Sequence, residues 1–184
     1  MIAEIYALST AFLRGFSAIT TKRGLQASNP NTSVIVTVIM NTLILWAVSL
    51  FLYPMSLASF QGVQYFVIAG FFAPGIAKIF MDTGLQRVGV AITTPIVSSN
   101  TLFSTIMAVL LLGEKITIFL GIGAVLIFIG AIILTHKGQS PVAWDRRDLL
   151  LPFTAAVLFA LSVNVRKLGL NIMEYPILGA AITS

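Results

Sequence analysis

Three charged residues lie inside long apolar stretches of the sequence: Arg14, Lys78 and Asp82. A charge at the centre of a membrane helix costs ~2.5–3.5 kcal/mol on insertion scales, so each of the three is a candidate for function. Lys78 and Asp82 are four residues apart, so they share one helix face and can form an ion pair. The pair either lines a polar cavity or merely neutralises two charges near one membrane face, and the sequence leaves both interpretations open.

Arg14 has no oppositely charged residue close to it along the chain. Its neighbours at helical spacing are hydroxyls, which together with it form one polar stripe on an apolar helix. A polar stripe that faces lipid is unfavourable, so we expect this one to face water or the interior of a helix bundle. Hydrogen bonding between packed helices is the alternative role. The stripe consists of Thr10, Arg14, Ser17 and Thr21.

A second polar stripe, with Asn100 beside it, lies in a later apolar stretch: Thr94, Ser98, Thr101 and Thr105. Pro95 in this stretch donates no backbone hydrogen bond and frees a carbonyl, which either binds a solute or ion or belongs to an ordinary kink. Pro74, beside Gly75, also either frees a carbonyl for binding or merely bends its helix. The candidates for a substrate path are Arg14, Ser17, Asn41, Lys78, Asp82, Ser98, Asn100 and Thr101, and the candidate helix kinks are Pro74 and Pro95.

Few residues of this sequence suit enzymatic chemistry. The one histidine, His136, falls in a hydrophilic segment, and the sequence has no cysteine, no paired intramembrane aspartates and no phosphate-binding G-x-x-x-x-G-K-[ST] loop. We therefore predict no catalytic residue, no metal site and no cofactor. The net charge of +5 does not indicate a nucleic-acid partner, because the basic residues lie at the ends of apolar stretches, where they snorkel or set topology.

The composition indicates a membrane protein. Hydrophobic residues make up 58% of the 184 residues and charged residues 9%, with a mean hydropathy of +1.00, whereas soluble domains carry about 25% charged residues. Residues 24–77, 88–113 and 116–136 contain no charge, and each stretch exceeds the ~20 residues that cross a bilayer as a helix. We predict an all-α, polytopic transmembrane helical bundle, surrounded by lipids in the plasma or inner membrane, and exclude a soluble enzyme.

Six spans can be placed along the chain: 2–21, 32–52, 63–83, 90–112, 116–135 and 149–165. Only Gly113, Glu114 and Lys115 separate the fourth and fifth spans, which predicts an antiparallel hairpin. In the fifth span, Gly123 with Gly130 and Ala124 with Ala131 put small residues on neighbouring faces, which favours close packing against other helices. A last apolar stretch, 175–184, is too short to span, so we expect the chain to be a fragment of a longer protein.

An internal repeat relates residues 9–25 to residues 154–170. A repeat unit of five spans places the second copy upside down, as in many secondary transporters, although chance similarity between apolar helices is the alternative. We predict a first five-helix repeat at 1–135, a hydrophilic linker at 136–148 and the start of an inverted second repeat at 149–184. The identical pairs are Ala11/Ala156, Leu13/Leu158, Ser17/Ser162, Lys22/Lys167, Gly24/Gly169 and Leu25/Leu170.

The chain resembles the EamA-type permeases of the drug/metabolite transporter superfamily. The resemblance rests on residues 84–117, whose apolar run closes with Gly113, Glu114 and Lys115, and on the Lys-x-Gly-Leu ending of the first span at 22–25. The glycine-bearing helix that follows, with Gly121, Gly123 and Gly130, also fits, while Thr101 replaces a proline of many members. The resemblance implies ten helices in two five-helix repeats and transport of small metabolites.

We therefore expect a secondary transporter that moves a small metabolite or drug-like solute by alternating access. The alternative is a non-transporting membrane scaffold or assembly protein. Residues 1–184 would hold half of the central site, so we expect no transport by this chain alone. A homodimer or a missing C-terminal repeat would complete it.

The membrane orientation is predicted differently by two arguments. The family usually has its N-terminus inside, whereas the positive-inside rule favours an N-terminus outside. With the N-terminus inside, the outer loops would hold Lys22, Arg23, Arg87, Lys137, Arg146 and Arg147, and the inner loops Lys115, Arg166 and Lys167.

Overall fold

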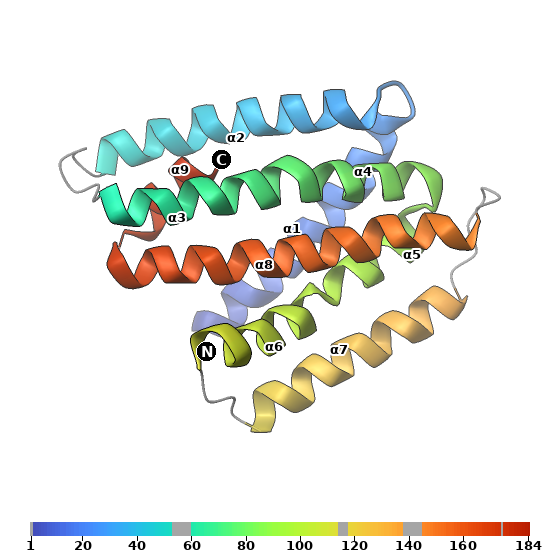
Figure 1. Ribbon diagram of the computed structural model, residues 1–184. Coiled ribbons are helices and arrows are strands. Elements are labelled where there is room, and N and C mark those ends of the chain that lie inside the picture. The colour runs from blue at the N-terminus through green and yellow to red at the C-terminus, as the bar shows by residue number, and fades with distance from the viewer. Residues whose placement is uncertain (1, 53–59, 114–117, 138–144, 174) are drawn as a thin grey trace.

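The computed structural model describes residues 2–52, 60–113, 118–137, 145–173 and 175–184. Among these residues no β-strand occurs, and the all-α bundle predicted from the sequence is confirmed (Figure 1). The helices are α1 (Ile2–Leu25), α2 (Pro30–Leu52), α3 (Phe60–Gly70), the π-helix η2 (Phe71–Ala77), α4 (Lys78–Arg87), α5 (Val90–Ser98), α6 (Asn100–Leu112), α7 (Ile118–Lys137), the 3₁₀-helix η3 (Arg146–Leu149), α8 (Leu150–Ile172) and α9 (Pro176–Thr183).

Four stretches of the described residues are helices long and apolar enough to cross a membrane: Pro30–Leu52, Gly62–Arg87, Val90–Leu110 and Arg147–Ile172. They agree with the second, third, fourth and sixth predicted spans. α1 and α7 coincide with the first and fifth. Large apolar side chains on α1 and α7 are exposed, for example Phe12 at 76% and Phe119 at 81%, as expected for helices that face lipid.

The helical stretch through α3, η2 and α4 contains Pro74 in its π-helical part. A proline has no amide hydrogen to give to the preceding turn, and a π-bulge with its wider i→i+5 pairing is one recognised irregularity at such positions. A hydroxyl from another helix supports this segment, because Ser162 Oγ of α8 donates a buried hydrogen bond to the carbonyl of Ala69, at 2.8 Å. The irregular segment is therefore tied to α8.

α8 lies at the centre of the described structure, packed against α3, η2, α4, α5 and α6 (Figure 1). The sequence placed the end of this span at residue 165, but α8 continues to Ile172, so Arg166 and Lys167 lie within the helix. The prediction was wrong because it stopped at the first charges, which do not terminate a helix. The helix ends at Ile172, because the backbone of Met173 is extended, and the next helix begins at Pro176.

α7 folds back along α5 and α6, as the predicted antiparallel hairpin requires (Figure 1). α6 ends at Gly113, whose φ of 66° is the left-handed conformation that glycine adopts at helix ends. Glu114 and Lys115 of the predicted turn, and residues 138–144 of the predicted linker, lie outside the described residues. The glycines Gly123 and Gly130 do not show the predicted close packing, because a Cβ at either position would meet nothing within 4 Å, whereas Ala124 of the same helix is buried. The side chain of Ala131 lies outside the part that the structure describes.

The Lys-x-Gly-Leu motif of α1 anchors that helix to α4. Lys22 Nζ donates hydrogen bonds to the carbonyl oxygens of Leu85, at 2.6 Å, and Gln86, at 3.0 Å, and Leu25 is buried. Free carbonyls and the negative end of the dipole collect at a helix C-terminus, so a lysine is favourable there.

We expect Lys22→Met to lower the free energy of unfolding by about 1 kcal/mol, because two carbonyls at the end of α4 lose a charged donor. Denaturant unfolding of the purified chain in detergent micelles measures the change. Arg23→Met is the matched control, since Arg23 is exposed on the same helical turn and no hydrogen bond of its side chain is seen among the described residues. Equal stability of the two variants would contradict the capping role.

Candidate functional site

A cleft of about 650 Å³ lies between α1 and α5. Its volume is within the range of small-molecule sites, ~300–1,000 Å³. The two polar stripes found in the sequence meet here, because Thr10 and Arg14 line one wall and Thr94 and Ser98 the other. Tyr6, Ala11 and Gly15 of α1 complete the lining.

The hydroxyls of the cleft donate hydrogen bonds to their own helices. Thr10 Oγ1 donates to the Tyr6 carbonyl at 2.7 Å, Thr94 Oγ1 to the Val90 carbonyl at 2.7 Å, and Ser98 Oγ to the Thr94 carbonyl at 2.9 Å. Their oxygens keep free lone pairs, and each hydroxyl can rotate toward a solute. The Arg14 guanidinium and the Tyr6 hydroxyl differ from them, because neither has a hydrogen-bond partner among the described residues.

A second arginine stands close to this cleft. Arg166 of α8 is near enough to Arg14 for the two positive charges to repel each other. The charge pattern of the sequence did not predict Arg166 at this site, because a basic residue after an apolar stretch indicates the end of a span. The available signal was the absence of a proline between Val165 and Met173.

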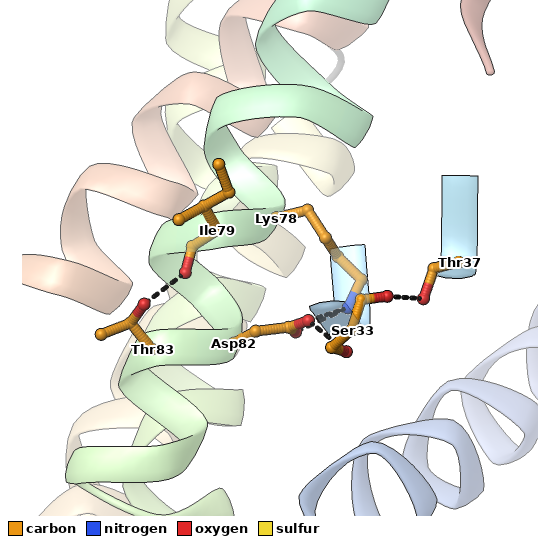
Figure 2. A network of polar contacts seen from close by, with 6 residues as sticks. All are labelled: Ser33, Thr37, Lys78, Ile79, Asp82 and Thr83. Carbon is orange, nitrogen blue, oxygen red and sulfur yellow. Dashed lines mark hydrogen bonds and ion pairs between the residues drawn. The ribbon is translucent and has the colours of Figure 1, made fainter. Parts of the chain in front are cut away.

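Lys78 and Asp82 form the predicted ion pair on α4, at the contact with α2 (Figure 2). Lys78 Nζ lies 2.5 Å from Asp82 Oδ1 and 2.7 Å from Oδ2, while Asp82 is 0% exposed and Lys78 17%. Ser33 Oγ of α2 donates to Asp82 Oδ2 at 2.8 Å, and Thr37 Oγ1 donates to the Ser33 carbonyl at 2.7 Å. The structure places this network between α2 and α4, apart from the residues that line the cleft.

The other predicted path residues are placed outside the cleft lining. Ser17 is exposed on α1, and Asn41 is exposed on α2. In α6, Thr101 Oγ1 donates to Asn100 Oδ1 at 3.3 Å. Pro95 lies inside α5, and the helix is interrupted at Ser99, whose Oγ donates to the Ile96 carbonyl at 2.6 Å.

Asn164 of α8 links α8 to α6, the interhelical role typical of an isolated amide in a span. Its Nδ2 donates to the Ser104 carbonyl at 3.1 Å, to Ser104 Oγ at 3.2 Å and to the Ala160 carbonyl at 2.9 Å. No group of three or more metal-binding side chains occurs in the part of the chain that the structure describes.

Comparison with known proteins assigns the chain to a family. Neither a curated protein nor a solved structure matches the sequence. The model of the EamA-like transporter family matches residues 1–136, which is well over half of the chain. Together with the apolar helices long enough to cross a bilayer, this match identifies a multi-pass membrane protein of a transporter family, and not an enzyme family. The chain belongs to the EamA-like transporter family.

Proposed function

We propose that this chain forms part of a secondary transporter in which a small organic solute crosses the plasma or inner membrane through the cleft between α1 and α5. The observation that carries the proposal is the meeting of two polar stripes, from helices far apart in the sequence, around a cleft of about 650 Å³. Polar groups inside membrane proteins face cavities or partners, because lipid cannot satisfy them. Alternating access requires such a cleft to open to each side of the membrane in turn.

The proposed architecture is a five-helix repeat at 1–135, a linker at 136–148 and the start of an inverted second repeat at 149–184. The identical residues at 9–25 and 154–170 support it, and so does the end of the family match at residue 136. Lipids surround the bundle, and a second repeat or a second copy of the chain supplies the other half of the site.

We expect a cysteine placed at Ser98 to react with a membrane-impermeant methanethiosulfonate while the chain is in its membrane. The chain has no cysteine of its own, so Ser98→Cys carries a single thiol at the cleft. The thiolate attacks the sulfenyl sulfur of the reagent, forming a mixed disulfide and releasing methanesulfinate, and the thiolate forms in water and not in lipid. Alternating access further predicts reaction with reagent applied to either side of the membrane.

Ile132→Cys on α7 is the matched control, because Ile132 is 53% exposed on an apolar helix that we expect to face lipid. The expected result is rapid reaction at Ser98→Cys and little at Ile132→Cys. If both thiols were equally inert, the cleft would be dry, and a scaffold or assembly role would replace the transport proposal.

A further inference from the structure

The hydrogen-bonding groups of the cleft are unbalanced in favour of donors. Among the lining residues that the structure describes, Arg14 is the one that is charged, and none carries a carboxylate. The carboxylates whose side chains the structure describes lie elsewhere: Asp82 at the α2–α4 contact, and Asp145 and Asp148 beside η3. Arg14 and the Tyr6 hydroxyl, both without a partner among the described residues, are therefore free to bind an acceptor.

The position of Arg14 along α1 adds to this imbalance. Arg14 lies near the middle of the helix Ile2–Leu25, about 18 Å from its first residue and about 17 Å from its last at 1.5 Å per residue. A side chain at that depth reaches the lipid headgroups poorly, so its charge needs a counter-charge or water within the bundle. Arg166 adds a second positive charge close by rather than a counter-charge.

We propose that the solute bound in this cleft is an organic anion whose carboxylate or phosphate group is held by the Arg14 guanidinium and the Tyr6 hydroxyl. The proposal names the substrate class of the transport path and rests on the function proposed above. An arginine forms paired hydrogen bonds with a carboxylate or phosphate, which a lysine cannot reproduce. Ala11 and Gly15 leave room beside Arg14 for the uncharged part of the anion.

The first test measures the electrostatic potential of the cleft without any knowledge of the solute. Ser98→Cys is treated with an anionic and with a cationic methanethiosulfonate of similar size, and the ratio of their rates is compared with the ratio for a free thiol in solution. We expect the anionic reagent to be favoured. Arg14→Gln should lower the ratio about tenfold, because one charge in the cleft acts in opposite directions on the two reagents. Arg23→Gln, at the exposed end of α1, should leave it unchanged.

The second test asks whether an anion occupies the cleft. Benzoate and phenyl phosphate should each slow the labelling of Ser98→Cys, whereas neutral benzamide should not. This comparison keeps Arg14 intact, so it stands even if Arg14→Gln fails to fold. Arg14→Lys, which keeps the charge but loses the paired hydrogen bonds, should retain the preference for the anionic reagent and lose most of the protection.

The outcomes separate this inference from the function on which it rests. If the thiol of Ser98→Cys does not react with the methanethiosulfonate reagents, the proposed transport path itself is overturned. If Ser98→Cys reacts but Arg14→Gln leaves the rate ratio unchanged, the path is water-filled and the anion site is overturned. Equal protection by benzamide and benzoate leads to the same conclusion.

The labelling experiment is finally repeated in bilayers of phosphatidylcholine alone and of phosphatidylcholine with phosphatidylglycerol. If phosphatidylglycerol abolishes protection by benzoate, a lipid headgroup occupies Arg14, and the organic anion is overturned as its ligand.

Discussion

Asp82→Ala is expected to lower the free energy of unfolding by about 3–5 kcal/mol, because it leaves the cation of Lys78 largely buried without its partner. The carboxylate of Asp82 is fully buried, and it accepts hydrogen bonds from Lys78 Nζ and Ser33 Oγ. Its removal therefore costs α2 and α4 the contact that joins them. Equilibrium unfolding of the purified chain in mixed micelles gives the free-energy change.

The double variant Lys78→Met/Asp82→Leu is the informative comparison. It removes both charges and fills the space with apolar atoms, so we expect it to be close to the parent in stability, as for other buried pairs replaced by apolar residues. Arg87→Ala breaks the exposed ion pair between Arg87 and Asp148, at 3.3 Å, and should cost at most about 1 kcal/mol. A loss for Asp82→Ala no larger than that for Arg87→Ala would contradict the role given to the buried pair.

Gly179→Ala is expected to destabilise the chain by about 1–3 kcal/mol and to displace α9 from α3. A Cβ at Gly179 would lie 2.5 Å from Cε1 of Phe66, well inside van der Waals contact. The ring of Phe66 is 0% exposed, and it lies so close to Gly169 of α8 that a Cβ there would be only 3.0 Å from Cε2, so α8 leaves the ring little room to move aside. Phe66 thus fills a slot between two glycines.

Two further variants test this slot. Gly130→Ala is the matched control, since a Cβ there meets nothing within 4 Å, and we expect it to be neutral or slightly stabilising because alanine favours helix. Adding Phe66→Leu to Gly179→Ala should restore part of the lost stability, although Phe66→Leu by itself is destabilising. Thermal unfolding in micelles distinguishes these cases. Strictly additive losses in the double variant would show that the clash is not with Phe66.

The residues that stabilise the bundle are separate from the residues that line the cleft, so stability and labelling can be tested independently. The Lys78–Asp82 ion pair joins α4 to α2, and the Phe66 slot joins α3 to α8 and α9, whereas the cleft lies between α1 and α5. Variants of Asp82 and Gly179 should therefore lower the free energy of unfolding with little effect on the labelling rate of Ser98→Cys. The reverse is expected for Arg14→Gln, which should change labelling while costing little stability.

The class of the protein, most of its spans and its local polar geometry followed from the sequence by itself. Charge-free stretches identify membrane helices because lipid tolerates little else over that length. The ion pair between Lys78 and Asp82 was predictable because residues four apart share a helix face regardless of the rest of the fold. The stripes that carry Arg14 and Ser98 were visible for the same reason.

Only the tertiary structure decided which faces meet. That the stripes of α1 and α5 line one cleft, that Ser33 completes the site of Asp82, and that Arg166 approaches Arg14 all depend on contacts between distant parts of the chain. The glycines also show that the sequence does not identify which helix faces are in contact. Gly123 and Gly130 have the spacing of a packing motif but face open space, whereas Gly169 and Gly179 flank Phe66. Periodicity along a helix tells which residues share a face, but the packing partner of that face is set by the energetics of the whole bundle.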